Sequence, residues 1–193
     1  MKRPEASTDD YQPGAALDAE AGRDGERFTL VFVRQLSHPP SKVWLALTDP
    51  EHLREWSPFD PDRDLGSTGT VKLTLVGGTS EPFESEVRLA EAPQILEYTW
   101  GGDVVRWELE AVESGTRLTL RHSVEDRTWL PKVAAGWHIC LDVAERALGG
   151  QPIGRIVAAD AKRFGWDRLN AEYAERFGVE NTGWPQELLG DEP

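Results

Sequence analysis

Along the middle of the chain, hydrophobic and polar residues alternate strictly in five segments, residues 70–76, 83–91, 95–100, 104–113 and 116–124. Alternation with a period of two is typical of antiparallel strands that bury one face. Glycine-containing joints between the segments fit hairpin turns. A sixth strand is predicted at Phe28–Leu36, where aromatic and β-branched residues dominate. The pattern therefore predicts an antiparallel sheet with an apolar inner face and a charged outer face.

Apolar residues at helical spacing predict the remaining elements. Pro39 and Pro40 precede a first helix, and a short second helix starts after Asp49. A long third helix is preceded by Pro131 and stopped by Gly149, and a further helix lies toward the C-terminus. In chain order, the apolar stripes of these helices include Trp44, Leu53, Trp137 and Tyr173.

Composition divides the 193 residues into three parts. Residues 1–26 have almost no large apolar side chains, so we expect a disordered acidic tail whose deletion costs little stability. Residues 27–150 hold the predicted sheet and the long helix, and residues 151–193 form a helical extension and an acidic tail. The mixture of an antiparallel sheet and separate helices predicts an α+β fold.

The net charge limits the classes of partner to expect, and the single cysteine indicates the cellular compartment. The net charge of -13 repels nucleic-acid phosphates and acidic lipid surfaces. No apolar stretch is long enough to cross a bilayer, and the N-terminus lacks the apolar run of a signal peptide. The single cysteine excludes an intrachain disulfide and indicates a reducing compartment. We therefore expect a cytoplasmic protein that binds no nucleic acid and does not insert into membranes.

The cysteine lies close to a histidine in the third helix. His138 and Cys140 are two residues apart, about 200° of helical rotation, so they point to opposite sides and cannot share a metal ion. Cys140 falls on the apolar stripe and should be a packed thiol of low reactivity, whereas His138 is expected to face water. Carboxylate pairs such as Glu108 and Glu110 fall on the outer sheet face. We therefore predict neither a metal site nor a cofactor.

Polar groups on the inner sheet face suggest a pocket. A curved sheet closed by one helix often leaves a cavity, and a few polar groups among aromatic rings are typical of small-molecule sites. The alternative is a filled core in which these groups pair with one another or with the backbone. His122 is the best candidate for a functional polar group. Twelve residues are predicted to line a ligand cavity: Trp44, Phe83, Ser85, Tyr98, Trp100, Trp107, Leu120, His122, Val133, Trp137, Cys140 and Leu141.

Four segments together carry a family resemblance: PPSKVWLALTDPEHLREW, ILEYTWG, GTRLTLRHS and GWHICLDVAERALGG. In this order they resemble bacterial proteins similar to the C-terminal domain of the activator of Hsp90 ATPase, part of the START-like (SRPBCC, Bet v 1-like) superfamily. The resemblance covers Arg27–Gly150. It implies a helix-grip fold, in which a curved antiparallel sheet surrounds a long C-terminal helix with a cavity between them. It does not imply one activity.

Three functions follow as hypotheses. The first is non-catalytic binding of an apolar small molecule in the cavity. The second is a polyketide aromatase/cyclase-like enzyme with His122 or Tyr98 as acid or base, although an enzyme should place two titratable groups in opposed environments and only His122 is clear. The third is a protein-partner module, either Hsp90 co-chaperone-like or a metabolite-resistance protein. We expect the first, and a protein partner stays open.

Overall fold

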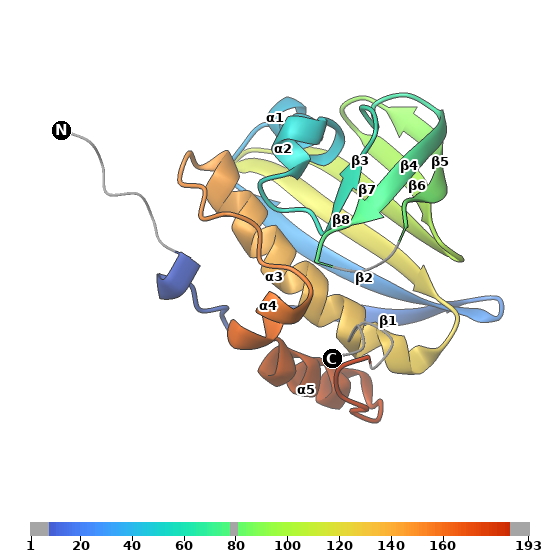
Figure 1. Ribbon diagram of the computed structural model, residues 1–193, viewed down its shortest axis with the longest axis vertical. Coiled ribbons are helices and arrows are strands. Elements are labelled where there is room, and N and C mark those ends of the chain that lie inside the picture. The colour runs from blue at the N-terminus through green and yellow to red at the C-terminus, as the bar shows by residue number, and fades with distance from the viewer. Residues whose placement is uncertain (1–7, 78–80, 186–193) are drawn as a thin grey trace.

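An antiparallel sheet and a long helix dominate the structure, a computed structural model that describes residues 8–77 and 81–185 (Figure 1). Within these residues the sheet has eight strands in the order β1-β2-β8-β7-β6-β5-β4-β3. The strands are β1 (Ala19–Asp24), β2 (Arg27–Leu36), β3 (Phe59–Pro61), β4 (Gly69–Leu75), β5 (Phe83–Glu91), β6 (Ile95–Trp100), β7 (Asp103–Val112) and β8 (Gly115–Val124). The helices are α1 (Pro40–Thr48), α2 (Pro50–Leu53), α3 (Leu130–Leu148), α4 (Ala159–Arg163) and α5 (Trp166–Phe177), with 3-10 turns at Thr8–Asp10 and Arg127–Trp129.

The alternating segments form the strands that the sequence predicts. In β7 the inward residues Val105, Trp107 and Leu109 are buried, and Trp107 pairs with Leu96 of β6 on one side and Leu120 of β8 on the other. On the outer face, Arg106 forms ion pairs with Glu97 at 3.0 Å and with Glu108 at 2.7 Å. The α+β helix-grip fold expected from the sequence is therefore confirmed.

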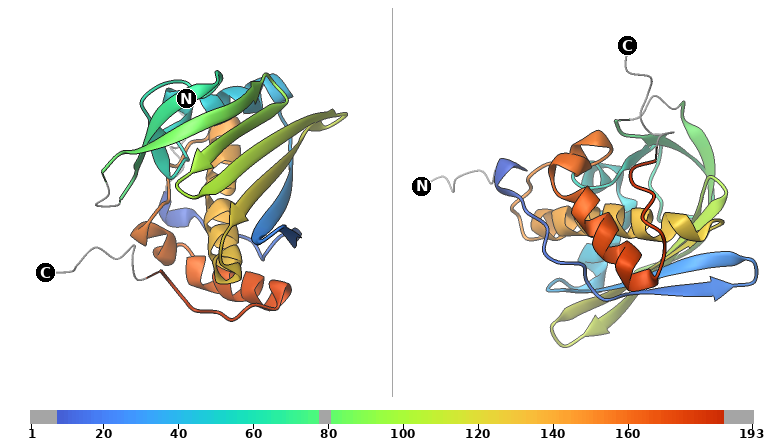
Figure 2. Two further views of the ribbon diagram at one scale, coloured as in Figure 1. Left: turned by 90° about the vertical axis from the view of Figure 1, so that its right-hand side faces the viewer. Right: turned by 90° about the horizontal axis from the view of Figure 1, so that it is seen from below.

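The sheet curls around α3, and α5 crosses α3 on the side away from the sheet (Figure 2). This arrangement buries α3 on both sides: Trp137 and Cys140 on one, and His138 on the other. The expectation that His138 faces water is wrong, because its ring is only 1% exposed and contacts Tyr173 of α5. The polar side of α3 is covered by elements that lie far away in the sequence.

The N-terminal segment, residues 8–24, is part of the fold. Tyr11 is 1% exposed, and its hydroxyl donates a hydrogen bond of 2.9 Å to Asp142 of α3. Farther along, β1 pairs with β2 over residues 19–24. The expectation of a disordered tail is wrong for this segment, because a single aromatic ring and backbone hydrogen bonds hold a sequence that is poor in apolar residues. The same expectation for residues 1–7 lies outside the described residues.

The C-terminal extension, residues 151–185, packs against α3. It holds α5, which the sequence predicts, and α4, which it does not. Trp184 lies in the acidic tail that the sequence predicts after the last helix, but it is 9% exposed and its ring lies edge-on to Trp166 at 4.6 Å between centroids. The rest of that predicted acidic tail, residues 186–193, lies outside the described residues. The extension therefore adds a layer to the domain up to Pro185.

Candidate functional site

A cavity of about 200 Å³ lies between the inner face of the sheet, α3 and the C-terminal extension. The sheet contributes Trp100 and His122, and α3 contributes Val133, Trp137 and Cys140. The other lining residues are Pro58, Trp129, Lys132, Gly136, Ile156, Val157, Ala158, Ala161, Trp166, Trp184 and Pro185. Five of the lining residues are tryptophans.

Of the twelve residues predicted to line a ligand cavity, the five from the sheet and α3 named above do line this one. The other seven are not among its lining residues: Trp44, Phe83, Ser85, Tyr98, Trp107, Leu120 and Leu141. The reason is visible at Trp107, whose ring packs edge-on against Trp56, just after α2, at 6.2 Å and against Trp137 at 5.2 Å. The end of α2 thus fills the space over this part of the sheet, and the filled-core alternative holds there.

His122 carries the polar chemistry of the cavity. The indole Nε1–H of Trp137 donates a hydrogen bond of 2.8 Å to Nδ1 of His122. His122 is only 4% exposed, and its Nε2 has no hydrogen-bond partner among the described residues. The nearest acidic atom is Oδ2 of Asp103 at 3.6 Å, and the Asp103 carboxylate is also paired with Arg27. Nδ1 of His122 therefore accepts from the Trp137 indole, whereas the buried Nε2 is left without a hydrogen-bond partner among the described residues.

The cavity adjoins a wider groove of about 760 Å³. Both are lined by Pro58, Trp100, Trp129 and Ala158, so the two spaces are neighbours. The groove is acidic, with the carboxylates of Asp103, Glu125 and Asp126. In the cavity the charged lining residue is Lys132, whose ammonium lies 4.9 Å from the ring centre of Trp129. A mostly apolar cavity thus adjoins a negatively charged groove.

Two small residues shape this space. Gly136 lies in the middle of α3, and a Cβ placed on it would meet no atom within 4 Å. Ala158 lies between cavity and groove with φ 49° and ψ −135°, a backbone conformation that is costly for a residue with a side chain. Helical glycine costs about 1 kcal/mol relative to alanine. At Gly136 the residue type is unfavourable for a helix, and at Ala158 the backbone conformation is unfavourable for a side chain. Such locally unfavourable positions are common at functional sites.

The titratable groups near the cavity are poorly suited to acid–base catalysis. Burial raises the pKa of the Tyr98 hydroxyl well above its usual range, and this hydroxyl accepts from Trp107 in the core at 3.3 Å. Burial also raises the pKa of the Cys140 thiol to about 12, which disfavours a thiolate nucleophile. Within the described residues there is no group of three side chains that could hold a metal ion. The cavity is built for contact and hydrogen bonding.

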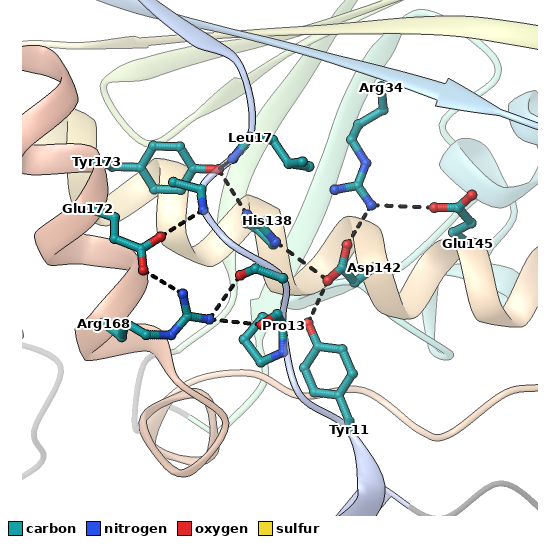
Figure 3. Close-up of polar contacts among 12 residues, drawn as sticks. Tyr11, Pro13, Leu17, Arg34, His138, Asp142, Glu145, Arg168, Glu172 and Tyr173 are labelled. Carbon is teal, nitrogen blue, oxygen red and sulfur yellow. Dashed lines mark hydrogen bonds and ion pairs between the residues drawn. The ribbon is translucent and has the colours of Figure 1, made fainter.

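A second polar cluster lies on the opposite side of α3 (Figure 3). His138 Nδ1 is 2.8 Å from the Tyr173 hydroxyl, and its Nε2 is 3.5 Å from Asp142. Asp142 also accepts from Arg34 at 2.5 Å and from Tyr11 at 2.9 Å. The members come from β2, α3, α5 and the N-terminal segment, and nearly all of their groups are paired. This cluster ties the N-terminal segment and α5 to α3 and β2.

Sequence reasoning missed the cavity residues that follow α3. Trp166 is the first residue of α5, a helix that the sequence predicts, but the apolar pattern of that helix does not show that Trp166 faces the cavity. The high number of tryptophans, eight in the chain, was the available signal. Five of these eight line the cavity, namely Trp100, Trp129, Trp137, Trp166 and Trp184.

Comparison with known sequences identifies a family. The sequence profile described as Activator of Hsp90 ATPase homolog 1-like protein matches residues 37–149, more than half of the chain. The match begins just before α1 and ends just after α3, so it excludes the N-terminal segment and the C-terminal extension. No curated protein matches the chain.

Solved structures share the fold at low sequence identity. EF2215 from Enterococcus faecalis, a conserved protein of unknown function, is 19% identical with a TM-score of 0.65, over 83% of this chain and 91% of that one. CalU16 from Micromonospora echinospora is 23% identical with a TM-score of 0.61, over 81% and 96%. The AHSA1-like protein from Aeromonas hydrophila is 20% identical with a TM-score of 0.53, over 63% and 92%. At such identities the likeness establishes the fold.

Proposed function

The chain belongs to the Activator of Hsp90 ATPase homolog 1-like family, and from this premise we propose that it binds an apolar small molecule, without catalysis, in the cavity between the sheet, α3 and the C-terminal extension. The fold supports ligand binding in general. The aromatic lining and the adjoining groove support the choice of an apolar molecule. Burial of a few hundred Å² of ligand surface at ~25 cal/mol per Å² offers several kcal/mol before the entropy cost of association.

The observation that carries the proposal is the space beside Gly136. A helix that only needed to pack would gain stability from alanine at this position, because glycine gives up about 1 kcal/mol in a helix interior. A Cβ would fit, since no atom lies within 4 Å of it. Glycine therefore keeps open a space that the protein would be more stable without.

The enzyme alternative finds less support in the same residues. A general base needs a ring nitrogen that can take a proton from a substrate. Nδ1 of His122 already accepts the Trp137 indole N–H, a group that can only donate. Tyr98, the second candidate, lies in the filled core outside the cavity. The pair of opposed titratable groups that such an enzyme requires is not assembled here.

The protein-partner alternative needs apolar anchors on the surface. Among the described residues, three large hydrophobic side chains are exposed, Leu17, Val33 and Leu45. They lie in the N-terminal segment, β2 and α1. A small-molecule ligand is therefore the better-supported partner.

Binding of the neutral fluorescent probe N-phenyl-1-naphthylamine tests the proposal. The wild-type protein should bind it with an increase in probe fluorescence, and Gly136→Phe should weaken binding at least about tenfold because the added ring occupies the cavity. Glu175→Phe is the matched control, since it adds the same ring at an exposed position of α5 and should leave binding unchanged. Gly136→Ala should stay folded and gain about 0.5–1 kcal/mol of stability.

Equal probe binding by the wild type and Gly136→Phe would place the probe elsewhere and count against the cavity. Failure of the wild type to bind N-phenyl-1-naphthylamine or other neutral apolar probes would sink the proposal. Native mass spectrometry of the protein purified from its own host supplies a second test, because a retained ligand would appear as a fixed mass increase that Gly136→Phe abolishes.

A further inference from the structure

The hydrogen-bond pattern of His122 determines where its ring proton lies. The Trp137 indole N–H can only donate, so Nδ1 of His122 accepts and carries no proton. The proton of the ring is therefore on Nε2, which becomes a donor. Nε2 is buried and lacks an acceptor among the described residues. Such a buried donor is costly unless something accepts from it.

The surroundings of Nε2 select the kind of acceptor. Oδ2 of Asp103 lies at 3.6 Å, too far for a hydrogen bond but close enough to repel an anion. Glu125 and Asp126 add negative charge in the adjoining groove. A carboxylate or phosphate at His122 would lie beside Asp103 and next to this acidic groove, and the cation that lines the cavity, Lys132, lies over the Trp129 ring at 4.9 Å. A neutral oxygen such as a carbonyl meets no such repulsion.

The cavity around His122 selects the body of the ligand. Trp100 and Trp137 flank the imidazole, with ring centroids 6.3 Å and 6.1 Å from it. Trp166 and Trp184 supply aromatic surface from the extension. Indole faces and edges bind flat rings through offset and edge-to-face contacts, which flexible acyl chains do not use.

We propose that the cavity selects a neutral aromatic molecule that bears a carbonyl oxygen, and that the Nε2–H of His122 donates the hydrogen bond that orients it. This inference rests on the proposed function, since it names the class of ligand for the same cavity. His122 is then a specificity-determining residue, and Trp137 is a positioning residue that acts through the imidazole. The free energy comes from the aromatic contacts, and the choice among aromatic molecules comes from the hydrogen bond.

Three matched probes test the inference on the full-length protein: 9-fluorenone, fluorene and fluorene-9-carboxylate. They share a tricyclic skeleton, and only the first bears a neutral carbonyl. Quenching of tryptophan fluorescence gives each dissociation constant. We expect 9-fluorenone to bind about tenfold more tightly than fluorene, as one hydrogen bond to a buried donor predicts. The carboxylate should bind more weakly than both. In His122→Phe the ratio between ketone and hydrocarbon should fall to about one.

A measurement on the wild type keeps the test independent of how well His122→Phe folds. In protein with ¹⁵N-labelled histidine, the nitrogen shifts of His122 should report the Nε2–H tautomer. The Nε2 signal should move on addition of 9-fluorenone and stay in place on addition of fluorene. In Trp137→Phe, which lacks the indole N–H, the preference for this tautomer and for the ketone should both diminish.

The outcomes separate this inference from the proposed function. Equal binding of 9-fluorenone and fluorene, with an unchanged Nε2 signal, overturns the role of His122 and leaves the cavity as an apolar site. Tighter binding of the carboxylate than of the ketone overturns the neutral class. Binding of none of the three probes overturns both this inference and the proposed function.

Discussion

At the scale of single residues, burial alone does not reveal a role. Trp100 and Trp107 both lie on inward-facing positions of neighbouring strands, but the first lines the cavity and the second is packed between Trp56 and Trp137. Cys140 and His138 are both buried on α3, and only Cys140 meets the cavity. The neighbour that covers a side chain decides what the side chain does.

The Cys140 thiol should react slowly in the native protein. Burial raises its pKa to about 12, so the thiolate is scarce at neutral pH. Labelling with a chromogenic disulfide reagent at pH 8 should be much slower in native than in urea-unfolded protein, and an occupied cavity should slow it further. Native labelling at the rate of the unfolded chain would contradict the packing of Cys140 against the cavity.

The carboxyl group of Asp142 should make the free energy of unfolding depend on pH in the acidic range. Burial by itself would raise the pKa of this carboxyl, but the hydrogen bond from His138 and the charge and hydrogen bond of Arg34 outweigh it and hold the pKa at about 2. The folded-state pKa is below the unfolded value, so this stabilisation is present above about pH 4 and is lost as the pH falls toward 2. It is on the order of 2 kcal/mol.

Urea unfolding between pH 5 and pH 2.5 measures this dependence. The wild type should lose stability steadily over that range, and Asp142→Asn should be less stable at pH 5 but lose less as the pH falls. Parallel pH profiles for the two proteins would show that other carboxylates carry the acid sensitivity.

At the scale of elements, the N-terminal segment behaves as a tie between α3 and α5 (Figure 3). The backbone N–H of Ala16 donates to Glu172 at 2.7 Å, and that of Leu17 donates to the Tyr173 hydroxyl at 3.1 Å. Arg168 donates to the carbonyl of Pro13 at 2.8 Å. Helix α5 is thus held by a segment from the other end of the chain.

Tyr11→Ala should therefore destabilise the protein by about 3 kcal/mol, since it removes a fully buried ring. Tyr11→Phe keeps the ring and loses only the hydrogen bond to Asp142, so it should cost about 1 kcal/mol. Thermal or urea unfolding of both variants measures the difference. This expectation replaces the one from sequence, in which removal of residues 1–26 costs little stability; a negligible cost for Tyr11→Ala would support the expectation from sequence.

At the scale of the whole molecule, the family domain and the C-terminal extension share the cavity. The family match ends at residue 149, whereas Ile156, Ala161 and Trp166 all line the cavity. Arg155 ties the extension to the end of α2 and to β3, through hydrogen bonds to the Arg54 carbonyl at 2.7 Å and to Asp60 at 2.8 Å. The cavity, and with it the proposed binding site, is therefore complete only when the extension is docked.

Removal of the residues after Gly150 should abolish binding of N-phenyl-1-naphthylamine. Because the shortened chain exposes one side of α3 and can fail to fold, Trp166→Ala is the companion variant. It should weaken probe binding at least about fivefold at temperatures where circular dichroism shows a folded protein. A folded Trp166→Ala protein that binds the probe with wild-type affinity would exclude the extension from the site.

Among the described residues, no helix is long and apolar enough to cross a membrane. The cytoplasmic location inferred from the single cysteine stays a prediction, as does the identity of any protein partner.

The sequence by itself determined the strands β2 and β4 to β8, the long helix and the side to which the residues of those strands point, but not β1 or β3. Period-two and period-3.6 patterns record which side of an element is buried, and burial is a local consequence of hydrophobicity. They correctly placed His122 inward and Cys140 on the apolar stripe. They also favoured the family that the profile match identifies.

Only the tertiary structure decided what each buried side faces. The hydrophobic pattern is the same for a side chain in a filled core and for a side chain at a cavity, because folding removes both side chains from water. Trp56 packs against Trp107 and fills the core at that position. The residues of the extension and Trp100 instead line a cavity. Tyr11 and His138 became buried through contacts between segments over 100 residues apart and 35 residues apart, respectively. Such contacts depend on three-dimensional packing, which no local pattern contains.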